Sequence, residues 1–160
     1  MDNVLTSSDH LDGGSGQKPV IVASLLSIAK STRAFLALLL AEIDLHPGQD
    51  QLLDRLEPAT PISVSALADA LSVRPSTVSK MLDRLIDKGL VARESSSSDA
   101  RRTMVRLTEE GVGVQLKVRQ LWDRFETDLV SAIEAPELRD LDGALMRIGD
   151  LLSQKLRRLR

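Results

Sequence analysis

The chain has 160 residues, of which 42% are hydrophobic, 28% charged and 2% aromatic, with a formal net charge of −2. These values fit a soluble globular protein with an aliphatic core, which favours packed helices over a β-sandwich. The absence of cysteine excludes disulfides, thiolate catalysis and cysteine-based zinc sites, and the separation of the two histidines matches no helical metal pair.

The N-terminal part of the chain predicts a tail followed by one long helix. Residues 1–18 are polar and lack the apolar centre of a secretory signal, so we expect a disordered tail and a cytoplasmic protein. Apolar residues at helical spacing predict a helix over 20–45, which Pro47 and Gly48 end. Residues 34–41 are apolar on every side, so we expect them to be buried on most sides, and the run is too short to span a membrane.

The middle of the chain predicts three short helices and a β-hairpin. Ser63 or Ser65 can cap the second of these helices. Pro75 suits the first turn of the third helix, and Gly89 ends it. Two strands around a polar turn then have the pattern of a wing-type hairpin. The expected helices cover 49–56, 66–71 and 75–88, and the expected strands cover 90–93 and 103–107.

Two long helices close the chain. Thr108 has the chemistry of a helix cap, and we expect its helix to run to about residue 133. Pro136 opens a last helix, whose leucines recur at three- and four-residue steps like the seam of a coiled coil. One small domain cannot cover all this apolar surface, so we expect a second copy of the chain to cover it. We therefore assign the dimerisation region to 19–48 and 109–160, and a separate compact domain to 49–108.

The segment 62–111 contains the features of a helix-turn-helix. The second helix of such a unit must present small, hydrogen-bonding side chains near its N-terminus, so that its backbone can approach the major groove of DNA. Ser76, Lys80 and Arg84 fall on one face of the helix predicted over 75–88, opposite its apolar residues. The total charge does not exclude nucleic acid as a partner, because a local basic patch decides phosphate binding.

The same segment resembles the MarR family of bacterial winged-helix regulators. Residues 99–108 read DARRTMVRLT, which is similar to the family's D-x-R-x-x-x-V-x-L-T signature, and Gly111 follows. Residues 76–80 read STVSK, which resembles the start of the family's recognition helix. The order of the expected elements agrees with the family over nearly the whole chain after residue 19.

The resemblance implies a mainly α fold with a small β-hairpin wing, a winged helix-turn-helix whose N- and C-terminal helices form a dimer. It implies a transcriptional regulator, in our interpretation a repressor, that binds a pseudo-palindromic double-stranded DNA operator as a homodimer. Many members release DNA when a small, often aromatic, molecule binds between the dimer helices and the winged domain. Arg101 corresponds to the arginine that enters the minor groove, and Asp99 to the carboxylate that orients it. The residues implied to contact DNA are Ser63, Ser65, Ser76, Thr77, Ser79, Lys80, Arg84, Asp99, Arg101 and Arg102.

Three further residues are candidates for binding a small molecule. Arg33 could hold a carboxylate or pair across the dimer, because it is a cation that enters an apolar stretch. His46 could serve as a ligand contact or as a helix-end cap, and Trp122 as a ligand platform or a packing residue. No nucleophile–base pair, phosphate loop or metal cluster stands out, so we predict no enzymatic activity, no metal or cofactor, and no membrane partner.

The basic residues of the predicted recognition helix also have a simpler interpretation. Lys80 and Arg84 could form surface ion pairs with neighbouring carboxylates, for which the candidates are Asp83, Asp87 and Glu94. The winged helix would then be a protein-interaction module without DNA binding. We favour DNA binding because the helix caps, the groove face and the wing all point to it.

Overall fold

The computed structural model describes residues 21–95 and 103–159. The predicted tail lies outside these residues, as do the predicted wing contacts Asp99, Arg101 and Arg102. The described part contains the predicted elements in the predicted order, with one short strand added. In chain order they are α1 (Ile21–Ala41), α2 (Gln49–Arg55), β1 (Ile62–Ser63), α3 (Val64–Ala70), α4 (Pro75–Asp87), β2 (Val91–Ser95), β3 (Thr103–Leu107), α5 (Glu109–Ser131) and α6 (Ala135–Arg158).

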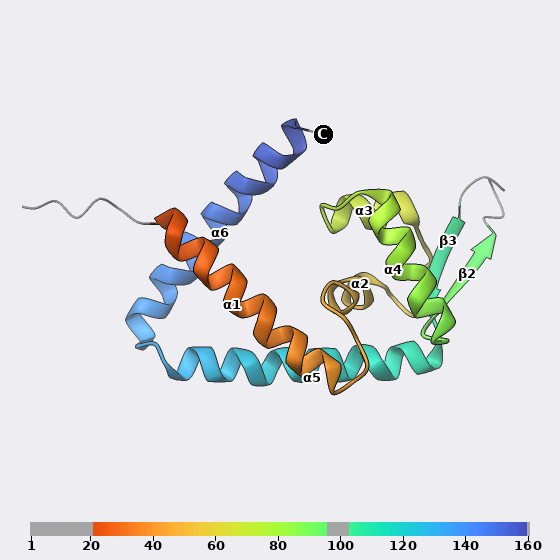
Figure 1. Ribbon diagram of the computed structural model, residues 1–160, viewed down its shortest axis with the longest axis horizontal. Coiled ribbons are helices and arrows are strands. Elements are labelled where there is room, and N and C mark those ends of the chain that lie inside the picture. The colour runs from red at the N-terminus through yellow and green to blue at the C-terminus, as the bar shows by residue number, and fades with distance from the viewer. Residues whose placement is uncertain (1–20, 96–102, 160) are drawn as a thin grey trace, which may run out of the picture.

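The long helix α5 connects two ends of the molecule that differ in character (Figure 1). One end carries α3, α4 and the strands β2 and β3, which form the winged-helix unit. At the other end the chain turns into α6, which leads away from α5, and α1 extends towards the same end. The mainly α fold with a small hairpin is therefore the one that the sequence predicts.

The signals at helix ends act as predicted. Thr108 Oγ1 accepts a hydrogen bond from the backbone N–H three residues on, at 3.0 Å, and Ser63 Oγ caps α3 in the same way at 3.2 Å. Pro75 lies in the first turn of α4, where a missing N–H donor does no harm. Gly89 follows α4 with a φ of 72°, a left-handed conformation that glycine adopts without steric penalty.

The first helix ends earlier than predicted. α1 ends at Ala41 rather than near Leu45, because the chain turns there. Asp44 adopts a left-handed φ of 57°, and Leu45 N donates a hydrogen bond to the Leu40 carbonyl at 2.9 Å. The proline and glycine predicted to end α1 lie instead in the link to α2.

The three strands form one antiparallel sheet in the order β1-β3-β2. β1 escapes prediction because two residues have no period, and only its pairing with β3, Ile62 opposite Val105, defines it. β3 has the predicted limits, whereas β2 begins and ends slightly later than predicted. Val91, Val105 and Leu107 share one face of the sheet and are at most 2% exposed.

The core lies in the winged-helix unit and against the first half of α5. It is aliphatic, as the composition predicts, and leucine makes up most of it. Burying such side chains contributes about 1.5–3 kcal/mol each, which makes this unit the stable part of a single chain. Besides the three sheet residues, the buried hydrophobic residues are Leu40, Leu45, Leu52, Leu53, Leu56, Leu67, Ala68, Val78, Leu82, Leu85, Leu90, Val118 and Leu121.

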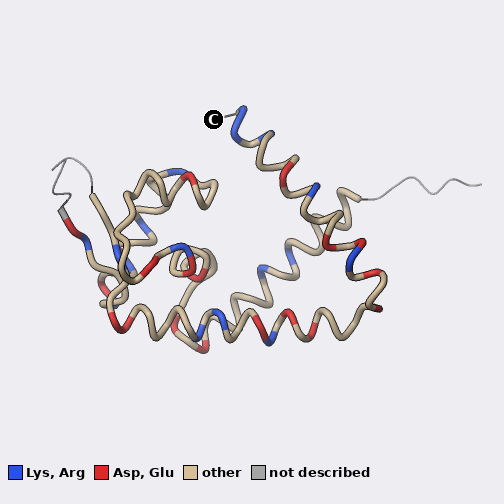
Figure 2. The backbone as a smooth tube through the Cα atoms, turned by 180° about the vertical axis from the view of Figure 1, so that it is seen from behind, with Lys and Arg blue, Asp and Glu red and all other residues tan. Residues whose placement is uncertain are grey.

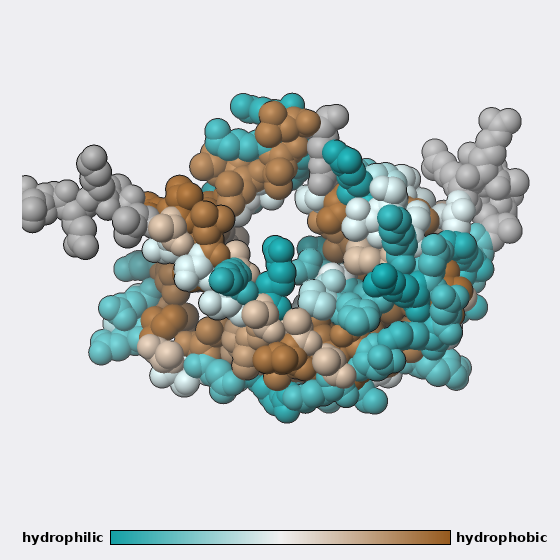
Figure 3. All heavy atoms as spheres, viewed as in Figure 1, coloured by the Kyte–Doolittle hydropathy of each residue, from teal (hydrophilic) through white to brown (hydrophobic). Residues whose placement is uncertain are grey.

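The outer helices α1 and α6 leave most of their apolar residues exposed, and apolar surface gathers on them in Figure 3. Only Leu40 is buried in α1, and no residue is buried in α6. The prediction that residues 34–41 are buried on most sides is therefore wrong for a single chain. α1 meets the rest of the chain near its C-terminal end, where the Phe35 ring lies 5.1 Å from the Phe125 ring of α5.

The exposed apolar residues of these two helices form a large surface. Among the described helices, α1 also has the length and composition of a membrane-crossing helix. That property is weak evidence, because apolar helices of soluble proteins share it. The exposed large residues of the two helices are Ile21, Val22, Leu26, Ile28, Phe35, Leu38, Leu141, Leu145, Met146, Leu151, Leu152 and Leu156.

Candidate nucleic-acid interface

The helix α4 has two chemically different faces. Val78, Leu82 and Leu85 are completely buried and fix α4 against the core. The predicted DNA contacts of this helix lie on its other side, where their side chains are available to a partner. Ser76, Thr77, Lys80 and Arg84 are exposed, and Ser79 is half-buried.

The connection between α3 and α4 is as tight as a helix-turn-helix requires. Ala68 is completely buried, and its carbonyl accepts a hydrogen bond from Val73 N at 3.0 Å. Ser72 between them has a left-handed φ of 53°, which is uncommon for a residue other than glycine. The small side chain and the sharp turn hold the start of α4 beside α3.

The two serines predicted near phosphates have different surroundings. The Ser63 hydroxyl already caps α3, so it has a structural role whatever else it does. Ser65 is exposed, and its hydroxyl lies 3.2 Å from that of Ser63. The two hydroxyls thus form one hydrogen-bonded pair at the start of α3.

These serines belong to a small polar hollow with a volume of about 310 Å³ between α3, α4 and the hairpin. Its hydrogen-bonding residues are Ser63, Ser65, Ser79, Arg93 and Thr103. The structure therefore brings three of the predicted contacts together. Arg93 and Thr103 were missed, because nothing local in the sequence places the inner face of the hairpin beside α4.

The ion pairs around α4 are not those of the simpler interpretation. Within the described residues, neither Lys80 nor Arg84 forms an ion pair. Asp83 pairs instead with Arg93, at 2.5 Å between Oδ1 and Nη2, and Glu94 pairs with an arginine of β3. Lysine and arginine are spread over several elements rather than gathered in one patch (Figure 2), so a few positioned cations must provide any phosphate binding.

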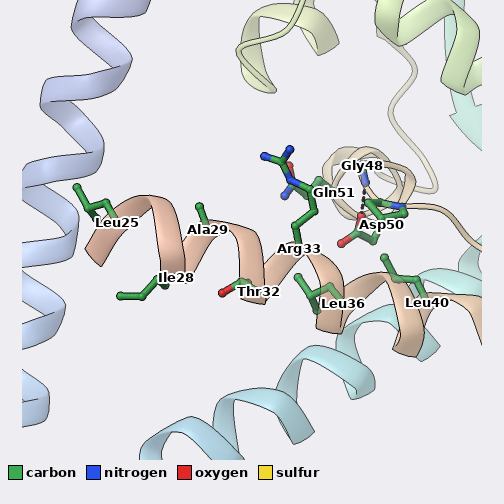
Figure 4. Close-up of a pocket in the computed structure, with 11 residues that line it drawn as sticks. Leu25, Ile28, Ala29, Thr32, Arg33, Leu36, Leu40, Gly48, Asp50 and Gln51 are labelled. Atoms are coloured by element: carbon green, nitrogen blue, oxygen red, sulfur yellow. Dashed lines mark hydrogen bonds between the residues drawn. The ribbon is translucent and has the colours of Figure 1, made fainter. Parts of the chain in front are cut away.

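A second cavity, of about 580 Å³, lies between α1 and α2. Figure 4 shows Arg33 extending from α1 towards Gln51 and Asp50 of α2. Asp50 is 2% exposed and accepts a hydrogen bond from Gly48 N at 2.8 Å, and the α1 side of the wall is mostly apolar. Of the three predicted ligand contacts, only Arg33 lines this cavity.

The other two predicted ligand contacts lie elsewhere. The side chain of His46 is exposed in the link between α1 and α2. Its backbone, rather than its imidazole, helps to begin α2, because His46 N donates to Gln49 Oε1 at 2.8 Å. Trp122 is half-buried on α5 and packs against the hydrophobic core.

Comparison with known proteins identifies the fold and shows a similarity to one family. The model of the MarR family matches residues 45–103, which contain α2, α3, α4 and β2. The structure of Escherichia coli MarR with operator DNA is similar over 81% of this chain and 94% of that chain, with a TM-score of 0.72 and 26% identity. Residues 45–103 of this chain are therefore similar to the MarR family.

The similarity to MarR-family proteins includes the outer helices. A MarR protein from Peptoclostridium difficile matches 99% of this chain and 100% of that chain, with a TM-score of 0.80 and 16% identity. A protein of Thauera aromatica, named as a transcriptional regulator for the hcr operon, is 31% identical over 102 residues. That match spans 64% of this chain but only 61% of the relative.

Three contacts hold the end of α2 on α5. Gln115 is 5% exposed, and its Nε2 donates to the carbonyls of Leu53 and Leu56 at 2.7 and 2.8 Å. One turn further on, Arg119 pairs with Asp54 at 2.9 Å. Both side chains hold the end of α2, so they determine how α5 carries the unit that contains α4.

A fourth contact ties the end of α4 to the link after α1. Lys88 Nζ lies 2.7 Å from Asp44 Oδ2 and also donates to the Asp44 backbone carbonyl. The hydrogen bond from Lys88, together with its positive charge, lowers the pKa of Asp44, while desolvation opposes the shift. Asp44 therefore stays ionised to lower pH in the folded protein than in the unfolded chain.

Proposed function

We propose that this chain is a sequence-specific transcriptional regulator that binds a double-stranded DNA operator. The observation that carries the proposal is the composition of the free face of α4, where Ser76, Thr77, Lys80 and Arg84 are exposed above a completely buried stripe. Small hydroxyl side chains allow the helix to approach the major groove, and the two cations supply base or phosphate contacts. The operator-bound structure of the E. coli relative supports this use of the fold.

We propose that the working form is a homodimer. The dimerisation region would consist of 19–48 and 109–160, where α1 and α6 expose leucine, isoleucine and phenylalanine side chains that a second copy would bury. Two copies related by a two-fold axis would place their α4 helices about one DNA turn, roughly 34 Å, apart. This spacing matches a pseudo-palindromic operator, on which a dimer would exclude other proteins and so repress transcription.

The remaining predicted contacts complete the proposal at the operator. Arg101 would enter the minor groove beside α4, with Asp99 orienting it and Arg102 adding charge. Ser63 and Ser65 would lie near a phosphate. The protein would act in the cytoplasm, where its DNA is, and we propose no catalytic activity.

A small molecule could release the DNA by binding in the cavity between α1 and α2. Its volume of about 580 Å³ falls within the range of roughly 300–1,000 Å³ that small-molecule sites occupy. The apolar wall of α1 would hold an apolar ring or chain, and Arg33 would hold an anionic group. Occupation would separate α1 from α2 and thereby move the unit that carries α4.

The test begins with selection of an operator from random DNA, followed by fluorescence anisotropy. We expect a dissociation constant on the order of 10⁻⁸ M for the selected sequence and much weaker binding to unrelated DNA. Arg84→Ala should weaken operator binding by roughly 1–3 kcal/mol, about 5- to 150-fold, without changing the fold. The matched control is Arg55→Ala, which removes an exposed arginine of α2 outside the predicted contacts.

Equal affinity for all sequences would contradict the proposed function. A protein partner bound in fixed stoichiometry, with no measurable DNA affinity, would instead support the interaction-module alternative. The same titration, run with and without DNA, separates the two.

A further inference from the structure

Arg93 occupies an unusual place in the hairpin. Strand residues alternate between the two faces of a sheet, so Arg93 shares a face with Val91. The register puts Arg93 opposite Val105 and Val91 opposite Leu107. These three neighbours are at most 2% exposed, so Arg93 places a charge in the row of residues that otherwise faces the core.

The side chain of Arg93 is only partly removed from water, and a partner offsets the desolvation that remains. Asp83 of α4 is this partner through the contact of 2.5 Å with Nη2, which also fixes the guanidinium beside the recognition helix. A guanidinium has five N–H donors, and this is the one hydrogen bond that the Arg93 guanidinium makes within the described residues. Half of the side chain remains exposed, so the other donors are accessible.

The accessible donors of Arg93 border the polar hollow of about 310 Å³. Hydroxyl groups line it from three directions: Ser65 at the start of α3, Ser79 in α4 and Thr103 at the start of β3. Thr103 lies on the same sheet face as Arg93, two residues along from Val105. A forked cation together with several hydroxyl donors is the set of groups that binds a phosphate dianion or diester.

We propose that this hollow binds one phosphate of the DNA backbone and that Arg93 is its principal ligand. The proposal rests on the proposed DNA-binding function, because α4 borders the hollow and a duplex against its free face would bring a phosphate to it. Phosphate contacts set the register of a protein on DNA but do not read bases. Arg93 therefore contributes equally to binding at the operator and at unrelated sequences.

The hairpin offers a matched control. Arg106 on β3 also pairs with a carboxylate, that of Glu94, and its side chain is 42% exposed compared with 50% for Arg93. In the register, Arg106 lies opposite Ala92, on the other face of the sheet, and it does not line the hollow. Removing either arginine changes the total charge identically, so only the position of the charge differs between the two variants.

The experiment measures operator binding by the full-length chain in a series of salt concentrations. For R93A and R93Q we expect at least a fivefold loss of affinity and a slope of log K against log salt that is smaller by about 0.9, the value for one phosphate contact. R93K should restore the slope, and R106A should leave both quantities unchanged. The loss should be the same on unrelated DNA.

Neutralising single phosphates then locates the contact. Each duplex in a series carries one uncharged methylphosphonate in place of a phosphate. At one position we expect this replacement to lower the DNA affinity of the wild-type protein but not that of R93Q. Inorganic phosphate at matched ionic strength tests the other source of the same chemistry. If it competes with DNA at the hollow, it should weaken DNA binding by wild type more than by R93Q. Binding of inorganic phosphate by the DNA-free wild type but not by R93Q, with equal DNA affinity of the two proteins, would overturn the assignment to DNA in favour of a free-anion site.

The outcomes separate this inference from the proposed function. If the wild-type protein binds its operator but R93Q keeps both the affinity and the salt slope, the proposed phosphate site is wrong, while the proposed function as a DNA-binding regulator still holds. If the wild-type protein binds no DNA, the proposed function is wrong. If R93A fails to fold, the measurements are made on R93Q alone, because glutamine keeps a long hydrogen-bonding side chain without the charge.

Discussion

Gly111 in the first turn of α5 shows how closely this helix approaches the hairpin. A Cβ atom at this position would lie 1.9 Å from the Leu90 carbonyl oxygen and 3.1 Å from Leu107 Cδ2. The oxygen cannot move freely, because it accepts the hydrogen bond from Thr108 N at 3.1 Å. Gly111→Ala must therefore displace α5 from the end of the core.

The expected effect is a balance of opposing terms. Alanine gains about 1 kcal/mol over glycine in helix propensity. Overpacking costs typically 1–3 kcal/mol and more where backbone must move, and the disturbed hydrogen bond adds about 1 kcal/mol. We expect a net destabilisation of about 1–3 kcal/mol, which lowers the melting temperature by roughly 2–12 °C in a chain of this size.

The measurement is thermal and urea unfolding at one fixed protein concentration, because dimer formation makes stability depend on concentration. Gly113→Ala on the same helix is the matched control, since nothing lies within 4 Å of its added Cβ, and it should gain up to about 1 kcal/mol. If Gly111→Ala is as stable as the wild type, α5 does not pack on the hairpin as closely as the structure has it.

Two further predictions concern contacts that position the winged-helix unit. Gln115→Ala removes the side-chain donor of the buried Leu56 carbonyl and one of the two donors of the Leu53 carbonyl, which still accepts from Leu56 N at 3.2 Å. The free energy of unfolding in urea should therefore fall by about 1–3 kcal/mol, and an unchanged midpoint would contradict this role. Because Lys88 lowers the pKa of Asp44, the pair stabilises the folded state above the usual carboxyl pKa, and this contribution is lost as the pH falls through the lowered value. Asp44→Asn should therefore lower stability near neutral pH but not in acid, and a difference from wild type that does not shrink on acidification would refute the assignment.

Much of the winged-helix unit could be predicted from the sequence because its signals are local. Pro75 and Gly89 bracket α4, Thr108 begins α5, and β3 follows its alternating pattern, all as observed. Each signal acts through hydrogen bonds or backbone torsions within a few residues. The predicted contacts on α4 share one free face for the same reason, since helical periodicity alone places them there.

The misses all involve partners distant in the chain. β1 exists only through its pairing with β3, and α1 ends early because Leu45 folds back on Leu40. The polar hollow was not predicted, because the sequence around Arg93 shows only an ordinary strand residue. Its position opposite Val105 and its ion pair with Asp83 of α4 depend on the tertiary structure. Residues 34–41 are not buried as expected in a single chain. An apolar sequence indicates that a segment packs against another surface, but it does not indicate whether that surface belongs to the same chain or to a second copy.

The sequence by itself determined the order of elements, the apolar faces and the resemblance to the MarR family, because periodicity, capping and the wing motif are encoded in neighbouring residues. Only the tertiary structure decided how α5 holds α2 through Gln115, how Lys88 reaches Asp44, and that Arg93 joins four hydroxyl groups in one hollow. These arrangements depend on where packed helices and paired strands bring distant residues together. Packing of the hydrophobic core determines those positions, and they cannot be predicted from short sequence patterns.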